Sequence, residues 1–315
     1  MDKLDRMFKK LSLLDEEELN STVDDVNNLI NLKIIQRQIH TGEKEEFDGY
    51  SKLARFTSSV IGSFAHSVLV ESRYGKFIVP IQDQGVGFEL RTKGTYADRE
   101  IEHIRGIINE DTSVLMIGAH VGSILVPISQ VCRDVTAIEA NPDTFELLKL
   151  NLFINNIQNC EVHNLAASDK QEMLKFLKNT VNSGGSKRKP LISEYMYTYD
   201  DPEEIIVEGM SMDIFLESRS FDLIIMDIEG SEYFALQGMT RLLDSCQTLI
   251  FEFVPHHLKN ISGVTVESFS KLLAVFDTLT IPSLNIKVTS ESFLTILNYL
   301  YEHNICEDGV IMEKN

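Results

Sequence analysis

Ser113-Val-Leu-Met-Ile-Gly-Ala-His-Val-Gly-Ser123 joins a short apolar run to two closely spaced glycines, Gly118 and Gly122. An apolar run that is closed by glycine and followed by a helical pattern is typical of a buried strand that turns tightly into a helix. Glycine has no Cβ, so such a turn lets a ligand approach the backbone closely. The segment therefore predicts a loop that binds a nucleotide-type cofactor.

Strands and helices alternate after this turn. Apolar runs at 134–139, 161–167, 221–227 and 247–253 are separated by helical patterns, of which 144–155 is the clearest. Alternation at this spacing predicts an α/β fold with a doubly wound parallel sheet. Ligands of such sheets bind at the carboxyl ends of the strands, which is where the glycine turn is expected to lie.

The first 65 residues are predicted to form an N-terminal helical extension. Apolar residues recur at three- and four-residue steps over 26–35, as in an amphipathic helix, and the charged segment 42–49 is expected to interrupt the helical pattern. An amphipathic helix needs a surface to pack against. That surface belongs either to this domain or to another subunit, so the extension is also a candidate contact in a homo-oligomer.

Residues 66–100 are predicted to form a β-hairpin and a connecting segment. Apolar residues flank a turn around Gly75, and 82–91 is expected to continue as a loop and a short strand. The main domain would then occupy residues 101–315.

The charge of the chain limits its partners. Lys and Arg total 29 against 48 acidic residues, which gives a net charge of −19. Nucleic acid is not an expected partner, because phosphate binding needs a basic surface. The four cysteines are widely spaced, the N-terminus lacks the apolar core of a signal peptide, and no apolar run approaches the roughly 20 residues of a membrane span. These features predict a cytoplasmic protein without a membrane span.

Glu139 makes the glycine turn more informative. It ends the next apolar run, 21 residues after Gly118. An acid at this distance can accept hydrogen bonds from ribose hydroxyls, in enzymes that use NAD and in those that use S-adenosyl-L-methionine (SAM). The phosphate-binding pattern Gly-x-Gly-x-x-Gly is absent, which favours SAM. The alternative for Glu139 is a solvated carboxylate at the end of a strand.

Four segments carry a resemblance to a known family. They are Ile117-Gly-Ala-His-Val-Gly122, Ala137-Ile-Glu-Ala-Asn-Pro142, Leu165-Ala-Ala-Ser-Asp169 and Met226-Asp-Ile-Glu-Gly-Ser-Glu232. Over approximately residues 70–260 the chain resembles the FkbM-type SAM-dependent methyltransferases. The resemblance implies the class I methyltransferase (Rossmann-like) fold, with a seven-stranded sheet whose last strand is antiparallel. It also implies SAM as the cofactor.

The same resemblance implies a reaction. Several family members are O-methyltransferases that act on sugars, glycoconjugates or natural products, so we expect a small-molecule or glycan acceptor. The family usually has an aspartate two residues before the first loop glycine, where this chain has Met116. One alternative is therefore a SAM-binding protein of the same fold with impaired catalysis. A nicotinamide-dependent oxidoreductase is a less favoured alternative.

Two residues are candidates for catalysis. Asp227 ends an apolar run at a place where this fold presents a catalytic or methionine-binding carboxylate, and Glu229 follows it as a further cofactor-binding candidate. Both carboxylates would instead suit the start of the next helix. His256 is a candidate base because histidine titrates near neutrality, although surface histidines are common. Asp227, Glu252 and His256 are too far apart in the sequence to indicate a metal, and no metal is predicted.

The remaining candidates belong to the cofactor site and to the acceptor. Gly118, Gly122 and Glu139 are joined by His120, which could donate a hydrogen bond to SAM or could simply be a polar residue that begins a helix. Ser168 and Asp169 are expected beside the adenine. The basic segment 183–189 is either a binding loop for an anionic acceptor or an ordinary solvated loop.

Overall fold

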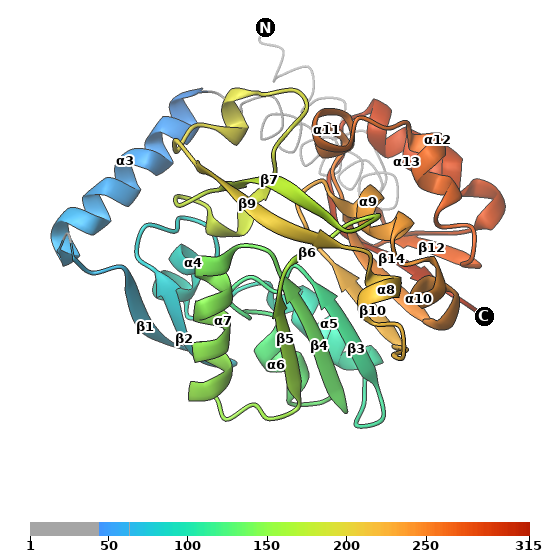
Figure 1. Ribbon diagram of the computed structural model, residues 1–315, viewed down its shortest axis with the longest axis horizontal. Coiled ribbons are helices and arrows are strands. Elements are labelled where there is room, and N and C mark those ends of the chain that lie inside the picture. The colour runs from blue at the N-terminus through green and yellow to red at the C-terminus, as the bar shows by residue number, and fades with distance from the viewer. Residues whose placement is uncertain (1–43, 63) are drawn as a thin grey trace, which may run out of the picture. The chain divides into compact units, whose positions relative to one another are not determined.

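An eight-stranded sheet forms the centre of the residues that the computed structural model describes, 44–62 and 64–315 (Figure 1). Five neighbouring strands are parallel, and three antiparallel strands follow at one edge. In spatial order the strands are β5 (Cys160–Asn164), β4 (Asp134–Glu139), β3 (Ser113–Ile117), β10 (Leu223–Met226), β11 (Thr248–Phe253), β14 (Glu307–Glu313), β12 (Thr278–Ile281) and β13 (Ile286–Thr289).

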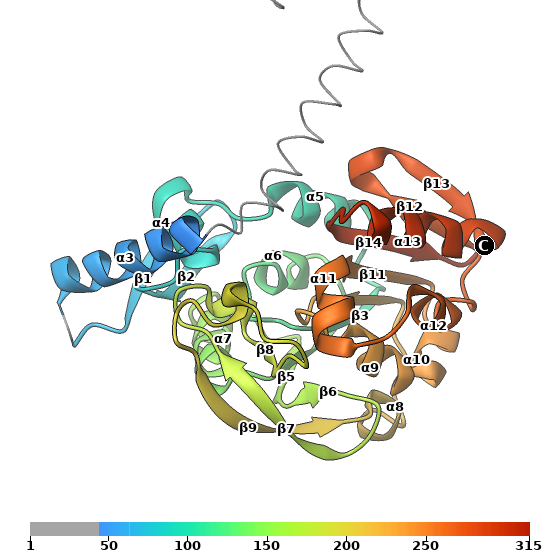
Figure 2. The same ribbon diagram turned by 90° about the horizontal axis from the view of Figure 1, so that it is seen from above.

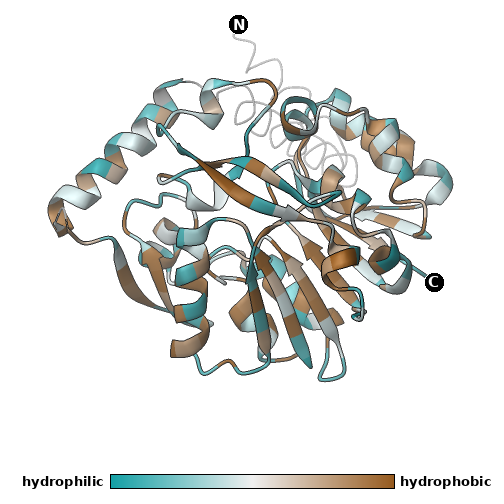
Figure 3. Ribbon diagram, viewed as in Figure 1, coloured by the Kyte–Doolittle hydropathy of each residue, from teal (hydrophilic) through white to brown (hydrophobic). Residues whose placement is uncertain are grey.

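The predicted α/β fold and class I methyltransferase topology are confirmed. As expected, the last strand of the chain, β14, is inserted antiparallel to β11. The expected number of seven strands is one too few, because Ile286–Thr289 turns back on β12 and adds an antiparallel edge strand. All five residues of β3 and all four of β10 are buried, as is typical of parallel strands that are covered on both faces. Figure 3 shows these central strands as largely apolar.

Helices cover both faces of this sheet (Figure 2). Helices α5 and α6 lie on one side, and α8, α9 and α10 lie on the other. The helices after the first hairpin are α4 (Val86–Lys93), α5 (Asp98–Ile107), α6 (Leu125–Ser129), α7 (Pro142–Ile154), α8 (Met212–Phe215), α9 (Glu232–Gln237), α10 (Thr240–Ser245), α11 (Pro255–His257), α12 (Val266–Lys271) and α13 (Phe293–Glu302). No helix in this described part combines the length and apolarity that crossing a membrane requires.

The N-terminal part of the described chain differs from expectation in two places. Helix α3 (Lys44–Ile61) contains most of the segment predicted to be a charged break. The hairpin of β1 (Ser67–Ser72) and β2 (Gly75–Pro80) is confirmed, but the loop and short strand expected over 82–91 are wrong, because α4 occupies most of that range. The amphipathic pattern at 26–35 lies outside the described residues, and the domain boundaries near 65 and 100 stay predictions within the unit Lys44–Asn315.

Helix α4 has a local cause that hydrophobic periodicity does not reveal. The carboxylate of Asp83 accepts hydrogen bonds from the backbone N–H of Gly85 at 2.8 Å and of Gly87 at 3.0 Å. These N–H groups lie at the start of the helix, where backbone donors lack partners within the helix. Gly94 adopts φ +68° and ends the helix.

A second, four-stranded sheet lies across one end of the main sheet (Figure 1). Strand β5 leads almost directly into it, so that end carries the carboxyl termini of the parallel strands. The strands, in spatial order, are β6 (Ala166–Ala167), β9 (Glu203–Met210), β7 (Glu172–Lys178) and β8 (Lys187–Arg188).

Candidate active site

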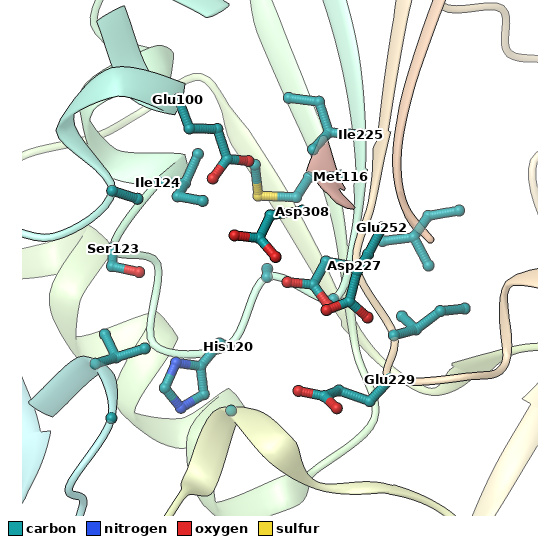
Figure 4. A pocket seen from close by; sticks show the side chains of 18 of the residues that line it. Glu100, Met116, His120, Ser123, Ile124, Ile225, Asp227, Glu229, Glu252 and Asp308 are labelled. Carbon is teal, nitrogen blue, oxygen red and sulfur yellow. The ribbon is translucent and has the colours of Figure 1, made fainter. Parts of the chain in front are cut away.

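A large cavity opens at the carboxyl ends of the parallel strands, beneath the smaller sheet. Its volume is about 1150 Å³, and its wall includes the glycine loop after β3, the end of β4 and the segment after β10. Helix α5 and strand β14 add residues from the opposite side. Figure 4 shows side chains from α5, the glycine loop, the segment after β10 and β14 facing one space. The sheet topology therefore brings together segments from five distant parts of the chain.

Gly118 makes the expected tight turn. Its φ is +90°, and a Cβ at this position would lie 1.7 Å from the carbonyl oxygen of Asp227. No side chain fits there without moving one of the two central strand ends. Gly122 also has a positive φ, but a Cβ there would meet Leu148 of α7, and Gly122 does not line the cavity. Gly118 thus allows the close approach of the segment after β10, whereas Gly122 allows close packing of α7.

Glu139 holds the glycine loop in place. One carboxylate oxygen accepts a hydrogen bond from the backbone N–H of His120 at 2.7 Å. The other accepts from the backbone N–H of Asn141 at 2.8 Å and from Thr144 Oγ1 at 2.9 Å. Glu139 is 7% exposed and still lines the cavity, so the alternative of a solvated carboxylate is wrong.

His120 belongs to a polar chain that sequence reasoning missed. Its ring Nε2 lies 2.7 Å from Ser183 Oγ, and the Ser183 hydroxyl donates to the buried carboxylate of Asp83. Because the serine proton goes to Asp83, the serine oxygen accepts from Nε2–H of His120. The other ring nitrogen, Nδ1, is then an acceptor, and it has no hydrogen-bond partner among the described residues. His120 therefore faces the cavity region with an unused acceptor.

Asp227 lies among other carboxylates. Its side chain is exposed to solvent in the cavity but surrounded by protein atoms, and the resulting partial desolvation, followed by repulsion from Glu229 and Glu232, raises its pKa well above the usual range. Burial, then the charge of Asp308, raises the pKa of Glu100 to about 7. Figure 4 shows Asp227, Glu100 and Asp308 near Met116. In the described part of the chain, no side-chain hydrogen bond or ion pair engages these three carboxylates.

A second group of charged side chains lies on the other side of Asp227. Lys187 Nζ is 2.9 Å from Glu229 Oε2, and His257 Nε2 is 3.4 Å from the same oxygen. His257 Nδ1 is 3.6 Å from Glu252 Oε2. Glu229 and Glu252 line the cavity, whereas Lys187 and His257 lie behind them. Burial is the main cause that lowers the pKa of His257 well below its ordinary value.

Several predicted site residues lie outside the cavity wall. His256 packs edge-to-face against His257, with ring centroids 4.6 Å apart, and does not line the cavity. Ser168 is fully buried and donates to Glu172, while Asp169 is half-buried beside Lys170. The neighbouring Ala166 and Ala167 contribute to the wall instead. The roles proposed for these three residues stay predictions.

The basic segment 183–189 is not an ordinary solvated loop. Lys187 is 6% exposed and pairs with Glu229. Arg188 and Lys189 pair with Glu172 and Glu204. All three cations are thus engaged by carboxylates of the protein itself.

Comparison with known proteins gives one extended match. The model of the methyltransferase FkbM domain family matches residues 117–304. No curated protein matches the chain. Among solved structures, methyltransferase FkbM from Methylobacillus flagellatus KT is 15% identical with a TM-score of 0.36, and the match covers 66% of this chain and 45% of that one. The chain therefore spans less than half the length of that protein.

Two other solved structures are similar at the same low level. An rRNA methylase from Streptococcus thermophilus is 12% identical with a TM-score of 0.38, over 69% of this chain and 94% of that one. TYW2 from M. jannaschii, solved in complex with AdoMet, is 15% identical with a TM-score of 0.34, over 59% and 63%. The family model, in contrast, covers more than half of the chain, and the protein belongs to the FkbM methyltransferase domain family.

Proposed function

We propose that the protein is a SAM-dependent methyltransferase that methylates a hydroxyl group of a sugar, glycoconjugate or natural product. One observation carries the proposal: Gly118, Glu139 and Asp227 lie on the wall of one cavity at the carboxyl ends of adjacent parallel strands. This is the place where open α/β sheets bind their ligands. The cavity volume of about 1150 Å³ is large enough for a nucleoside cofactor together with a small acceptor.

The residues around the cavity fit the parts of SAM. A carboxylate has about four lone-pair sites, and three protein donors occupy three of them, so Glu139 can accept one further hydrogen bond from a ribose hydroxyl. The α-ammonium group of the cofactor would be attracted by the carboxylates of Asp227, Glu100 and Asp308, which face the same part of the cavity (Figure 4). The loop has no third glycine for a pyrophosphate, which favours SAM over a nicotinamide cofactor.

Met116 does not deprive the cavity of acidic groups. Its side chain is buried where related chains usually have an aspartate, but Glu100 from α5 and Asp308 from β14 reach the same region (Figure 4). Carboxylates from two other elements therefore supply the negative charge that position 116 lacks. This arrangement supports a functional cofactor site over the alternative of impaired SAM binding.

Asp227 is the proposed general base. When bound, SAM supplies an electrophilic methyl group. The acceptor hydroxyl must lose its proton as its oxygen is methylated, and Asp227 is open to the cavity at the point where the glycine loop and the end of β10 meet. Its raised pKa suits the task, because a stronger base accepts a hydroxyl proton more readily. His256, behind the wall, would act only through other residues.

The charges around the cavity favour an uncharged, polyhydroxylated acceptor. Asp227, Glu229 and Glu252 would repel an anionic acceptor. Arg188 is the cation of segment 183–189 that lines the cavity, and its charge is offset by the ion pair with Glu172. The net charge of −19 likewise disfavours an RNA acceptor. We therefore expect hydroxyl groups of a neutral sugar or natural product to be methylated in preference to phosphorylated ligands.

Calorimetry and turnover assays test these proposals separately. Titration of the full chain with SAM and with S-adenosylhomocysteine should give one site per chain, and NAD should give none. No heat of binding at millimolar SAM would contradict the cofactor assignment, and binding of NAD alone would favour an oxidoreductase. Transfer of a ¹³C-methyl group to a panel of sugars, natural products and tRNA, followed by NMR, should show an O-methyl signal. Binding without turnover would support the alternative of impaired catalysis, and methylation of tRNA alone would overturn the acceptor class.

A further inference from the structure

A buried cluster of two carboxylates and one imidazole lies in and behind the cavity wall. Glu229 follows β10, Glu252 belongs to β11, and His257 ends α11. One possible ligand atom from each residue lies within 4.8 Å of the other two. We propose that Glu229, Glu252 and His257 bind a divalent first-row transition-metal ion, such as Mn²⁺ or Zn²⁺. This proposal does not depend on the proposed methyltransferase activity.

Two atoms in this cluster lack the partners that buried polar atoms normally have. His257 is 6% exposed, and its Nδ1 makes no hydrogen bond within the described residues. Glu252 Oε2 is likewise buried without a partner there, and the two atoms face each other at 3.6 Å. Buried polar groups are nearly always satisfied, so this pair needs an explanation. A cation bound between a carboxylate oxygen and a neutral imidazole nitrogen would satisfy both.

The charge balance points the same way. Glu229 and Glu252 lie close to the carboxylates of Asp227 and Glu232, which raise the pKa of Glu252 after burial. Lys187 supplies one positive charge, at 2.9 Å from Glu229. One lysine is thus not enough to offset the mutual repulsion of these carboxylates in a partly dehydrated place. A bound dication would stabilise the ionised forms of Glu229 and Glu252 more fully than one lysine can.

The donor set and the spacing indicate the kind of ion. An ion that binds its ligands at about 2.1 Å holds neighbouring ligand atoms roughly 3 Å apart, so the three side chains would move slightly inward. Imidazole nitrogen suits Zn²⁺ and other transition metals, whereas Mg²⁺ and Ca²⁺ prefer oxygen ligands. Only one ring nitrogen can bind, and we assign Nδ1, which has no other partner. Glu229 and Glu252 line the cavity, so the ion would border the space beside Asp227.

Metal binding can be measured without any cofactor or acceptor. The full chain without a histidine tag, stripped with a chelator and dialysed, would be titrated with Mn²⁺ while the EPR signal of free Mn²⁺ is followed. We expect one ion per chain at micromolar concentration, displaced by Zn²⁺. Pulsed EPR of the bound Mn²⁺ should show coupling to one imidazole ¹⁴N nucleus. Mg²⁺ should not displace the ion at tenfold excess.

Matched variants locate the site. Glu252→Gln and His257→Gln should each weaken Mn²⁺ binding at least tenfold. His256→Gln changes the neighbouring imidazole outside the cluster, and Asp308→Asn changes a cavity carboxylate outside it, so both should leave the affinity within about threefold. Circular dichroism and thermal unfolding would show whether each variant folds. If the buried His257→Gln variant does not fold, the ¹⁴N coupling in the unmodified protein still decides the assignment.

Three results would overturn the proposal. They are the absence of stoichiometric Mn²⁺ or Zn²⁺ binding below millimolar concentration in the folded chain, bound Mn²⁺ without ¹⁴N coupling, and equal loss of affinity in His256→Gln or Asp308→Asn. Calorimetry with SAM is independent of these measurements. A failure of the metal site and a failure of the methyltransferase assignment would therefore be seen separately.

Discussion

The substitution Glu139→Gln separates two roles that one carboxylate would combine. Glu139 accepts three hydrogen bonds within the protein, at 2.7, 2.8 and 2.9 Å, and these fix the glycine loop to the start of α7. The proposed ribose contact uses the same carboxylate from the cavity side. Glutamine keeps the size of the side chain but replaces one accepting oxygen with an NH₂ group, which cannot accept from a backbone N–H.

The expected effects follow from the number and kind of these bonds. Hydrogen bonds to a charged group contribute roughly 1.5–3 kcal/mol and neutral ones about 1 kcal/mol, so losing one bond and weakening the others should lower the free energy of unfolding by about 2–4 kcal/mol. If ribose hydroxyls also donate to Glu139, the loss of one such bond corresponds to about 10- to 150-fold weaker SAM binding. Urea unfolding of the free protein measures the first effect, and calorimetry with SAM measures the second.

Thr144→Val is the matched control. It removes the Thr144 hydroxyl, which donates to Glu139 and to the backbone oxygen of Asn141, and leaves the two backbone hydrogen bonds to Glu139 in place. The side chain is 1% exposed, and valine has nearly the same shape. We expect a loss of about 1 kcal/mol in the free energy of unfolding and SAM affinity within threefold of the unmodified protein. If both variants weakened SAM equally, Glu139 would act only by holding the loop. If Glu139→Gln changed neither quantity, the reasoning from its three hydrogen bonds would be refuted.

Three further changes test other parts of the site. Asp227→Asn should lower kcat at least about 100-fold and weaken SAM binding by a smaller factor, because Glu100 and Asp308 still attract the ammonium group. The rate of the unmodified enzyme should rise with pH through the raised pKa of Asp227, because only the ionised carboxylate accepts a proton. Full turnover in the variant would remove that role. Gly118→Ala should abolish SAM binding in calorimetry, because its Cβ would lie 1.7 Å from a carbonyl oxygen. The control Gly106→Ala lies at an open position in α5 and should raise the free energy of unfolding by about 0.5–1 kcal/mol. Similar behaviour of the two variants would contradict the steric argument. The pKa of Glu100, about 7 in the folded chain against 4.5 ordinarily, means that the folded state binds more protons between these values and loses stability as pH rises through them. Glu100→Gln should therefore be up to about 3 kcal/mol more stable than the unmodified protein at pH 8 but at most about 1 kcal/mol more stable at pH 5 in urea unfolding. A gain of the same size at both pH values would exclude this cause.

The sequence was most informative where a strand is buried on both faces. Segments 114–117 and 223–226 are continuous apolar runs, and each is followed directly by a residue of the cavity wall, Gly118 and Asp227. Gly118, Glu139 and Asp227 could be placed together because parallel strands present their carboxyl ends at one edge. Predicting that these three residues lie close together required only the order and direction of the strands.

Other parts of the fold left weaker patterns. Strand β7 carries two lysines and a glutamate among its apolar residues, and it pairs with β9 and β8 in the smaller sheet. Its local sequence pattern therefore does not distinguish it from a surface loop. Helix α4 is only eight residues long and depends on the carboxylate of Asp83, whose other partner, Ser183, is 100 residues away. A contact between residues so far apart in the chain cannot be predicted from the local sequence pattern.

The acidic side of the cavity shows why a single position in a motif is a poor guide to a site. Met116 replaces an acid on β3, but the edge of the sheet is also reached by α5, which precedes β3, and by β14 at the end of the chain. Glu100 and Asp308 are therefore available in space although neither belongs to the glycine motif. Their pKa values are already raised by burial and by neighbouring carboxylates, so a further acid at position 116 would add repulsion to this group. An apolar residue at 116 is thus physically compatible with a cation-binding cavity, because the negative charge that attracts the cation is carried by neighbouring elements.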